Sequence, residues 1–419
     1  MTSKVQAVPH TSQPLSEWLA WLETIHPVAI DMGLDRVSRV ADTLALRPVQ
    51  KPLILVGGTN GKGSVVTMLS AIYRKAGYCV GAYTSPHIMH FCERIRVDGE
   101  MVDEQAVVDA LAFIEQGRAD VSLTYFEYTT LAAMRIFQVR CCDVLLFEVG
   151  LGGRLDATNI WDAYCSVITS IGLDHEQYLG SDISVIATEK AAIGRAGKPF
   201  VVGEKSPPSS LAAYAVAHDF KLLDVGSKPL ESLPEPSMPG EHQRRNAGCA
   251  MAAVNALETM LPVPPHCLTD GLNEAQLAGR FEKITINGVT VVMDVAHNQA
   301  GAEALKLAWI SEFGTVRADI VFAILADKDA ASVVRALAPV VDTWHCTSLP
   351  VARAATVQNV IATVKQHADS AMVNAYNATN HALKAALKHA KESQRAVLIA
   401  GSFYTIEQVK KVLEDEGIN

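Results

Sequence analysis

Val56-Gly57-Gly58-Thr59-Asn60-Gly61-Lys62-Gly63-Ser64 is a glycine-rich segment that separates two different sequence patterns. Residues 52–56 form a short apolar run typical of a buried strand, and residues 65–75 place apolar side chains at helical spacing. A glycine-rich turn between a strand and a helix lets several main-chain N–H groups point at one anion. The helix N-terminus and Lys62 add positive charge there. The segment therefore predicts a phosphate-binding loop.

The spacing of this loop departs from the Walker A pattern. That pattern has four residues between its first glycine and the Gly-Lys pair, and Ser or Thr follows at once. Here only residues 58–60 separate Gly57 from Gly61, and Gly63 precedes Ser64. A glycine turn in some other α/β domain is the alternative, and the strand–turn–helix context argues against it.

Length and composition restrict the class of protein. The 419 residues suffice for two or three domains, and 49% of them are hydrophobic, which indicates a soluble globular protein. A formal charge of −9 argues against general nucleic-acid binding. No apolar run approaches the roughly 20 residues of a membrane span, and the N-terminus lacks a signal-peptide core. The eight cysteines show no paired CxxC spacing, so we expect reduced thiols in a cytoplasmic protein.

Strand-like and helix-like segments alternate along most of the chain, which predicts an α/β fold with parallel sheets. We expect an N-terminal P-loop ATPase-like domain over residues 1–283 and a smaller Rossmann-like α/β domain over residues 284–419. The alternation weakens over residues 204–240, where prolines are frequent, and restarts with a strand at 288–294. The second domain has no glycine loop of the first kind.

Ser85, Glu148 and His175 each lie at or just beyond the end of a predicted strand. Ligands of open parallel sheets bind beyond the carboxyl ends of the strands, so these side chains should converge with the phosphate-binding loop. A carboxylate such as Glu148 in an apolar strand needs a partner, and Mg²⁺ beside phosphates would supply one. The convergence predicts one site at one edge of the sheet.

Ordinary structural roles would also explain these residues. Glu148 could form an ion pair with Arg154, and a lone histidine such as His175 is more often a hydrogen-bonded structural residue. Lys190 lies either on a solvated helix face or in a buried place with an altered charge state. The sequence pattern alone leaves these alternatives open.

Three positions near the second domain are further candidates. Asp294 and His297 follow its first strand, and loop capping is the alternative to a role in ligand binding. Arg280 lies at the junction of the two domains, where it contacts a nucleotide or is simply a linker charge.

Together these segments resemble the folylpolyglutamate synthase/dihydrofolate synthase family of the Mur ligase superfamily. The resemblance spans most of the chain, and the shortened Gly-Thr-Asn-Gly-Lys loop is typical of that superfamily. The segments that carry it occur in the family's order and are Gly57-Gly-Thr-Asn-Gly-Lys-Gly-Ser64, Thr84-Ser-Pro-His87, Glu93-Arg94-Ile95, Phe126-Glu127, Glu148-Val-Gly-Leu-Gly-Gly-Arg-Leu-Asp-Ala-Thr-Asn159, Ile171-Gly-Leu-Asp-His175, Glu189-Lys190, Gly279-Arg280 and Asp294-Val-Ala-His-Asn298.

The resemblance implies a role for each of these segments. Mg²⁺ is expected at Ser85, Glu148 and His175, and Lys190 matches a lysine that becomes N-carboxylated in the family. With Lys62, the residues Glu148, His175 and Lys190 form the implied catalytic set. The implied ATP-binding residues are Thr59, Asn60, Gly61, Lys62, Gly63, Ser64, Asn246, Arg280, Asp294 and His297.

The implied reaction is ATP-dependent amide formation. A substrate carboxylate takes the γ-phosphoryl group to give an acyl phosphate, and the amino group of L-glutamate then displaces phosphate. The expected substrates are ATP, L-glutamate, dihydropteroate and tetrahydrofolates, and the expected state is a monomer without nucleic-acid or membrane partners. The implied pterin-binding residues are Ile30, Asp31, Thr124, Phe126, Glu127, Asp156 and Ala157.

Three other functions are alternatives to a bifunctional enzyme. A folylpolyglutamate synthase without dihydrofolate synthase activity would share most of the segments quoted above. A muramyl ligase would need a UDP-sugar domain, and only about 50 residues precede the first predicted strand. A nucleotide-binding interaction protein without ligase activity would have no reason to keep Glu148, His175 and Lys190 together.

Overall fold

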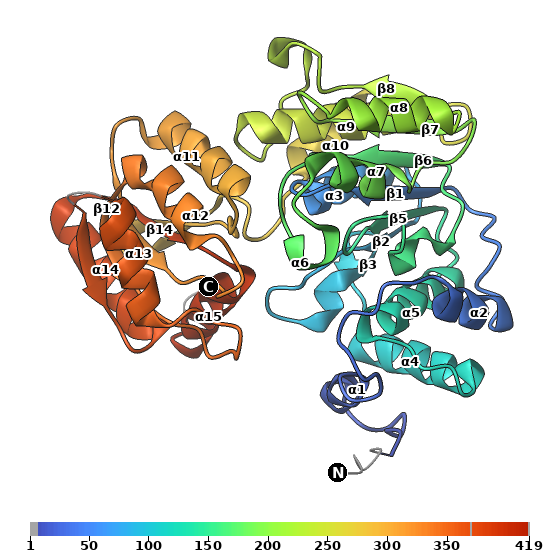
Figure 1. Ribbon diagram of the computed structural model, residues 1–419, viewed down its shortest axis with the longest axis horizontal. Helices are drawn as coiled ribbons and strands as arrows, with labels where there is room; N and C mark the ends of the chain where they lie inside the picture. Colours follow the sequence, from blue (N-terminus) through green and yellow to red (C-terminus); the bar gives the residue numbers. More distant parts are fainter. Residues whose placement is uncertain (1–6, 369–370, 418–419) are drawn as a thin grey trace. The chain divides into compact units, whose positions relative to one another are not determined.

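The computed structural model describes residues 7–368 and 371–417 of the chain (Figure 1). Contacts divide them into two compact units. The first comprises residues up to 85, 91–237 and 244–275, and the second comprises residues 86–90, 238–243 and those from 276 onward. The predicted boundary at 284 lies within strand β9 (Glu282–Ile286). The assignment of ATP and pterin binding to residues 1–283, and of glutamate ligation to residues 284–419, stays a prediction.

An eight-stranded sheet forms the centre of the first unit, with the strand order β4-β3-β2-β5-β1-β6-β7-β8. The strands from β2 to β8 in this order are parallel, and β3 and β4 add an antiparallel edge. Their bounds are β1 Leu53–Gly57, β2 Val80–Tyr83, β3 Ile95–Val97, β4 Glu100–Met101, β5 Val144–Glu148, β6 Cys165–Ile168, β7 Pro199–Val202 and β8 Lys221–Asp224.

Helices connect these strands and cover the sheet (Figure 1). α3 packs against β1, β2 and β5, and α10 packs on α3. The helices of this part of the chain are α1 Leu15–Leu22, α2 Asp35–Thr43, α3 Lys62–Lys75, α4 Glu104–Arg118, α5 Tyr125–Val139, α6 Glu176–Leu179, α7 Ile183–Ala191, α8 Ser209–Ala217, α9 Glu241–Ala256 and α10 Pro265–Glu274, with short 3-10 turns at Phe91–Arg94, Ala157–Ile160 and Leu230–Ser232.

Local sequence signals explain several of these helix starts. Asp103 accepts a hydrogen bond from the Ala106 N–H and so caps the start of α4. Thr124 and Glu127 form a capping box at the start of α5, in which each side chain bonds the other's main-chain N–H. These contacts satisfy N–H groups that the first helical turn leaves without partners.

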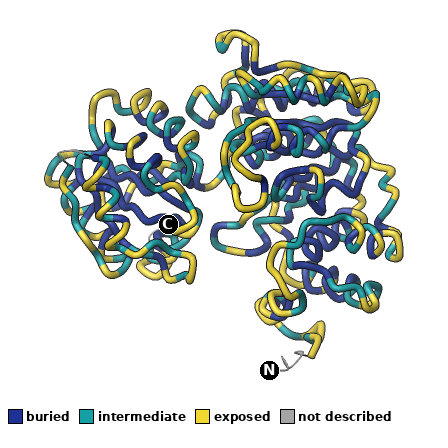
Figure 2. Tube along the Cα trace, viewed as in Figure 1, coloured by how far each residue is buried: buried dark blue, intermediate teal, exposed yellow. Residues whose placement is uncertain are grey.

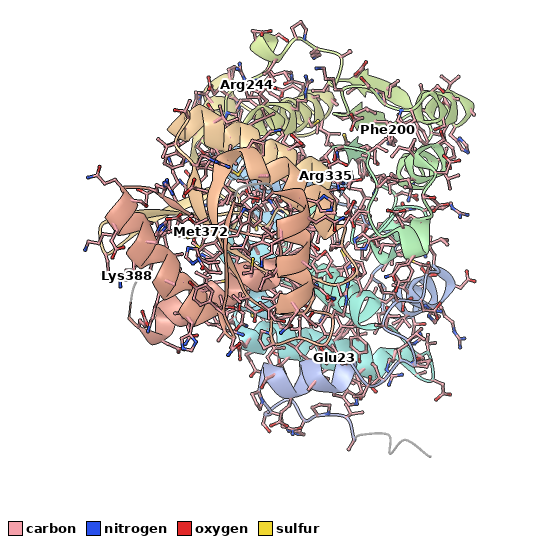
Figure 3. All side chains as sticks on the ribbon, turned by 60° about the vertical axis from the view of Figure 1, so that its left-hand side comes forward. Glu23, Phe200, Arg244, Arg335, Met372 and Lys388 are labelled. Carbon is pink, nitrogen blue, oxygen red and sulfur yellow. The ribbon has the colours of Figure 1, made fainter. Side chains whose placement is uncertain are left out.

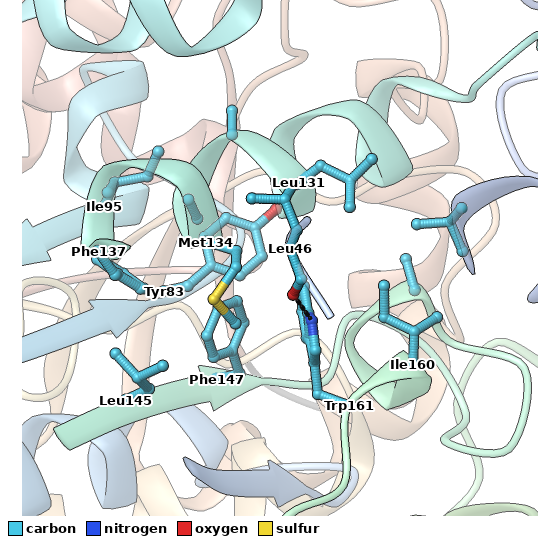
Figure 4. Packing of buried hydrophobic residues seen from close by; sticks show 14 of the residues in the cluster. Leu46, Tyr83, Ile95, Leu131, Met134, Phe137, Leu145, Phe147, Ile160 and Trp161 are labelled. Carbon is cyan, nitrogen blue, oxygen red and sulfur yellow. Dashed lines mark hydrogen bonds between the residues drawn. The ribbon is translucent and has the colours of Figure 1, made fainter. Parts of the chain in front are cut away.

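The first unit's core consists of apolar side chains between the sheet and its helices. Figure 2 shows the buried strands inside a more exposed layer of helices and loops. Phe147 of β5 lies between Tyr83 and Trp161, with ring centroids 5.6 and 5.0 Å away (Figure 4). The indole of Trp161 donates a hydrogen bond of 2.9 Å to the Leu46 carbonyl, so its buried N–H has a partner.

The second unit contains a six-stranded sheet with the order β13-β12-β11-β14-β10-β9. All neighbouring strands are parallel except β9, which pairs antiparallel with β10. Its remaining elements are β10 Val289–Met293, α11 Gln299–Phe313, β11 Ala318–Phe322, α12 Ala330–Leu337, a 3-10 turn Ala338–Val340, β12 Val341–Cys346, α13 Val357–His367, β13 Met372–Ala375, α14 Thr379–Ser393, β14 Val397–Ala400 and α15 Phe403–Asp415.

The two mainly parallel sheets confirm the predicted α/β fold class. The proline-rich segment 204–240 still contributes α8 and the edge strand β8, which is exposed and therefore lacks the apolar run that marks the inner strands. Among the described helices, none combines the length and apolar character needed to cross a membrane.

Candidate active site

The glycine loop lies at the carboxyl end of β1, where the sequence predicts it. Gly61 is the residue before α3 and has φ 91°, and Gly58 has φ 141°. A Cβ added to Gly58 would lie 2.0 Å from Thr169 Oγ1, which is far too close for any side chain. The loop after β6 holds this main chain in place, because Ser170 Oγ accepts a hydrogen bond of 2.9 Å from the Asn60 N–H.

Two side chains of the loop are suited to a phosphate ligand. Lys62 Nζ donates hydrogen bonds to the Gly58 carbonyl at 3.1 Å and the Thr59 carbonyl at 3.2 Å, so the ammonium group lies over the loop. The Ser64 hydroxyl is buried and has no hydrogen-bond partner among the described residues. A helix N-terminus that carries a lysine and an unpartnered hydroxyl fits an anion.

Asn246 of α9 lies against the same loop. A Cβ added to Gly61 would lie 2.5 Å from Asn246 Oδ1, so only glycine leaves room for the amide. Asn246 itself is buried, with 6% of its surface exposed. The structure thus brings a predicted ATP-binding residue from almost 200 positions along the chain to the phosphate-binding loop.

Ser85 and Glu148 meet at the ends of two neighbouring strands. Glu148 is the last residue of β5, pairs in register with Val56 of β1, and is only 5% exposed. The Ser85 N–H donates a hydrogen bond of 3.1 Å to Glu148 Oε2. Arg154, which was the possible ion-pair partner of Glu148 in the sequence, forms a salt bridge with Glu189 instead.

His175 lies in the loop between β6 and α6. It is exposed, adopts a left-handed backbone with φ 54°, and precedes the first residue of α6. Its N–H donates a hydrogen bond of 2.8 Å to Asp174 Oδ1. This turn also interacts with Lys190, because the negative charge of Asp174 favours the protonated form of the lysine and opposes the lowering of its pKa by burial.

Lys190 of α7 is a buried lysine rather than part of a solvated face, since only 5% of it is exposed. Burial is the main reason that its pKa falls from 10.5 to about 7, and the positive charge of Lys62 lowers it further. The turn of α7 around it packs on the loop after β5, because a Cβ on Gly153 would lie 2.6 Å from the Glu189 carbonyl oxygen and 3.0 Å from that of Lys190.

The residues predicted to bind a pterin fall into two groups. In one group, Arg36 joins Asp31 and Glu127, with nitrogen–oxygen distances of 2.7 and 3.3 Å. Glu127 also accepts a hydrogen bond from the Thr124 N–H at 2.7 Å, and Ile30 is exposed. Neither Arg36 nor its bridging role was predicted from the sequence.

The second group surrounds the glycine-rich loop after β5. A Cβ added to Gly150 would lie 2.5 Å from the ring of Phe126, so the glycine lets the ring pack closely on this loop. Asp156 accepts hydrogen bonds from the Leu151 N–H at 2.8 Å and the Thr158 N–H at 3.0 Å, which shape the loop and place the buried Ala157. Burial nevertheless raises the pKa of Asp156 above its ordinary value.

In the second unit, Arg280, Asp294 and His297 lie around one turn. Asp294 accepts hydrogen bonds of 2.9 Å from the N–H groups of Phe281 and Ala296, and burial raises its pKa although Arg280 opposes the shift. His297 Nδ1 lies 2.8 Å from the Val295 carbonyl. The Arg280 guanidinium lies 5.5 Å from the centroid of the Phe403 ring, a contact that the sequence did not reveal.

Comparisons with known proteins agree with this arrangement. Residues 279–403 match the family described as "Mur ligase, glutamate ligase domain". The chain is 39% identical to the dihydrofolate synthase/folylpolyglutamate synthase of Escherichia coli over 98% of both chains. The chain belongs to the dihydrofolate synthase/folylpolyglutamate synthase family.

Solved structures of this family have the same fold. E. coli FolC in complex with DHPP and ADP is 37% identical to this chain, with a TM-score of 0.89 over 98% of this chain and 100% of that one. A bifunctional folylpolyglutamate synthase/dihydrofolate synthase with Mn, AMPPNP and L-glutamate bound is 35% identical, with a TM-score of 0.84 over 97% and 100% of the two chains. Members of this family are ATP-dependent amide-forming ligases, so the predicted enzyme class is confirmed.

Proposed function

We propose that this chain uses Mg-ATP to join L-glutamate to dihydropteroate, which gives dihydrofolate, and to folates, which extends their glutamate chain. The observation that carries the proposal is the gathering of the loop at Lys62, the Ser85–Glu148 pair and the buried Lys190 beside the carboxyl end of one parallel sheet. That edge is where sheets of this kind bind their ligands.

The chemistry takes two steps. A carboxylate oxygen of the pteroate or folate attacks the γ-phosphorus of ATP, the bond to the bridging oxygen breaks, and ADP and an acyl phosphate form. The neutral amino group of L-glutamate then attacks the acyl carbon, inorganic phosphate leaves, and the nitrogen loses a proton. Phosphorylation is needed because an oxide dianion is a far poorer leaving group than phosphate. The protein contributes positioning and charge neutralisation.

We assign the phosphate contacts to Lys62 and to the main-chain N–H groups from Thr59 to Ser64. The ammonium of Lys62 lies within 3.2 Å of two loop carbonyls, so it can turn to a phosphate oxygen over a short path. Asn246 beside Gly61 is proposed to contact the nucleotide from α9. In the second unit we assign nucleotide contacts to Arg280, Asp294 and His297.

Mg²⁺ fits the residues present at this site. Glu148 is a buried carboxylate at a strand end, and carboxylate oxygen is a ligand that Mg²⁺ prefers. We propose that Ser85, Glu148 and His175 hold the ion. When bound, Mg²⁺ neutralises charge on the phosphates during transfer. The Ser85 N–H holds one carboxylate oxygen of Glu148 at 3.1 Å and so fixes the orientation of the carboxylate.

Lys190 is proposed to react with carbon dioxide to form a carbamate. In that step the neutral amine attacks the carbon of CO₂, an N–C bond forms and a proton is released. A pKa of about 7 supplies the neutral amine near neutral pH, and the adjacent positive charge of Lys62 favours an anion at this position. The resulting carboxylate would stand in a place where a charged ammonium is costly.

We place the pterin at the residues around Arg36 and at the loop after β5. Asp31, Glu127 and Asp156 supply carboxylates, and Phe126 supplies an aromatic face, which suits a flat heterocycle with ring N–H groups. Thr124 holds Glu127 through the capping box, Ala157 lies beside Asp156, and Ile30 is exposed.

The decisive experiment measures phosphate release and glutamylated product from the purified chain with Mg-ATP and L-glutamate. Dihydropteroate and tetrahydrofolate are compared as acceptors. Turnover with both is expected. Turnover with tetrahydrofolate alone would leave a folylpolyglutamate synthase, and turnover with neither would overturn the ligase proposal. A monomeric state and a cytoplasmic location stay predictions.

A further inference from the structure

Three metal-ligating side chains lie together in the second unit, and the reaction proposed above does not use them. They are Asp319 on β11, His345 on β12 and His389 on α14, and one potential ligand atom from each lies within 4.8 Å of the others. β11 and β12 are parallel neighbours in which Thr343 pairs with Asp319 and His345 pairs with Val321. Because side chains alternate along a strand, Asp319, Thr343 and His345 face the same side of the sheet.

α14 lies over this part of the sheet and carries the third ligand. It packs on β11 and β12, and His389 comes near its C-terminal end, next to the exposed Lys388 labelled in Figure 3. The His389 side chain is 34% exposed, whereas Asp319 and His345 are 0% and 2% exposed. The cluster therefore has two deeply buried ligands and one at an opening to solvent.

Buried polar atoms without partners are concentrated here. Asp319 Oδ1, Thr343 Oγ1 and His345 Nε2 all lack a hydrogen-bond partner among the residues that the structure describes. Each such atom costs about 1–3 kcal/mol, and an unseen water or ion is a usual explanation. Three of them on neighbouring positions of two strands point to one shared occupant.

The other ring and carboxylate atoms are already held in place. His345 Nδ1 lies 3.1 Å from the Tyr376 hydroxyl, and an Nδ1–H that donates to it leaves the lone pair on Nε2. Asp319 Oδ2 lies 2.9 Å from His389 Nδ1. The contact of Tyr376 with His345 comes from outside the ligand set, as is common for metal-binding histidines, whereas the contact of Asp319 with His389 joins two of the three candidate ligands.

We propose that Asp319, His345 and His389 bind one transition-metal cation of the zinc type, at a site separate from that of the ligase reaction. Two imidazoles and one carboxylate suit Zn²⁺, whereas Mg²⁺ prefers oxygen ligands alone. Bonds of about 2.0–2.2 Å put tetrahedral ligand atoms roughly 3.3–3.6 Å apart, and the atoms of the three groups lie within 4.8 Å of one another, so a small side-chain movement would bring them to that spacing. The partly exposed His389 can make that movement, and water can take the fourth position.

A trapped water molecule is the competing occupant. Arg395 lies 3.7 Å from Asp319 Oδ1 and offsets part of the carboxylate's charge, which disfavours a cation. Arg395 also pairs with Asp342, so its charge is shared between two carboxylates. The two occupants differ in a measurable way, because only a metal gives stoichiometric binding that depends on the imidazoles.

The test measures Zn²⁺ binding to the chelator-treated full chain by equilibrium dialysis with excess Mg²⁺ and no nucleotide. One Zn²⁺ per chain is expected, together with the visible absorption of tetrahedral Co²⁺ when Co²⁺ replaces it. His389→Gln and Asp319→Asn should weaken binding at least tenfold. His381→Gln, which changes an exposed histidine of the same helix, should bind as the wild type does.

Glu148→Gln separates this site from the proposed Mg²⁺ site, and it should leave Zn²⁺ stoichiometry unchanged. Circular dichroism checks that each variant is folded. If Asp319→Asn does not fold, the conclusion rests on His389→Gln, because the partly exposed His389 tolerates substitution better than the buried Asp319. The proposal is overturned if the wild type binds no Zn²⁺ under these conditions, or if His389→Gln binds it as tightly as His381→Gln. Neither result depends on ligase activity, so the proposed function stands or fails separately.

Discussion

The Ser85 N–H and the Glu148 carboxylate are joined by a hydrogen bond of 3.1 Å between the loop after β2 and the end of β5. These two strands are parallel neighbours, so both chain segments leave the sheet at the same edge. The contact fixes one oxygen of Glu148 and determines where the rest of its charge lies. Loss of this hydrogen bond should therefore lower the catalytic rate more than it lowers the stability of the fold.

Glu148→Gln keeps the shape of the side chain and removes its charge. We expect kcat to fall by about 100-fold or more and the Mg²⁺ concentration for half-maximal rate to rise, because a neutral amide is a poor Mg²⁺ ligand. The measurement is the steady-state rate over a series of Mg²⁺ concentrations. Glu104→Gln, at an exposed carboxylate of the same unit, is the control. Wild-type Mg²⁺ dependence in Glu148→Gln would remove this residue from the metal site.

Gly61→Ala and Gly77→Ala form a matched pair. Both glycines have a similar φ, 91° and 89°, so the backbone strain of an alanine should cost about 1 kcal/mol of stability at each position. An added Cβ meets Asn246 at 2.5 Å at Gly61 but nothing within 4 Å at Gly77. Only Gly61→Ala should raise the KM for ATP, by about tenfold or more. Equal KM values in the two variants would contradict the placement of ATP at this loop.

Lys190→Ala should abolish turnover, and bicarbonate should not restore it, because the alanine cannot form a carbamate. In the wild type, ¹³C-labelled bicarbonate should give a carbamate carbon signal by NMR. Lys198→Ala, which changes an exposed lysine of the same unit, should retain both the signal and the activity. A wild-type chain that is active without the signal would argue against carboxylation, and near-normal turnover in Lys190→Ala would argue against any catalytic role for this lysine.

Burial of Lys190 also predicts how stability depends on pH. Between pH 7 and 10.5 the unfolded chain holds a proton on this amine and the folded chain does not, so its contribution to stability rises with pH. In thermal unfolding experiments without CO₂, Lys190→Met should be more stable than the wild type at pH 7. That advantage should shrink by roughly 1 kcal/mol per pH unit toward pH 10. A difference independent of pH would mean that the lysine stays charged in the folded chain.

Thr124→Ala and Asp103→Ala each remove the side chain that caps a helix of 15 residues. Each should cost about 1 kcal/mol of stability. The Thr124 hydroxyl also accepts a hydrogen bond from the Glu127 N–H and so positions the helical turn that carries the Glu127 carboxylate, which contacts Arg36 at 3.3 Å. Only Thr124→Ala should therefore raise the KM for dihydropteroate. The KM for ATP should be unchanged in both variants. A wild-type KM for dihydropteroate in Thr124→Ala would move the pterin away from the start of α5.

The sequence predicted those parts of the site that follow from strand order. The carboxyl ends of parallel strands meet at one edge of a sheet, so the sequence alone places the loop at Gly61, Ser85 and Glu148 together. The buried state of Lys190 stayed open, because a lysine on a short helix has the same sequence pattern whether its face is covered or solvated. Only the packing of α7 against the loop after β5 decides between them.

Contacts between distant segments were out of reach. The approach of Asn246 to Gly61 depends on how α9, which begins at Glu241, packs against the phosphate-binding loop. The cluster of Asp319, His345 and His389 depends on the register of β11 with β12 and on the position of α14. None of the three residues lies in a recognisable spacing with another.

Gly153 is a position at which evolution of this sequence cannot introduce a larger residue. Its Cα faces the carbonyls of Glu189 and Lys190 at distances that leave no space for a methyl group. A lineage that replaced this glycine would have to move the turn of α7, and with it the lysine, even though the new side chain touched no substrate. Screens for loss-of-function substitutions should therefore find Gly153 as intolerant as Lys190, and selection for altered folate preference should leave it unchanged.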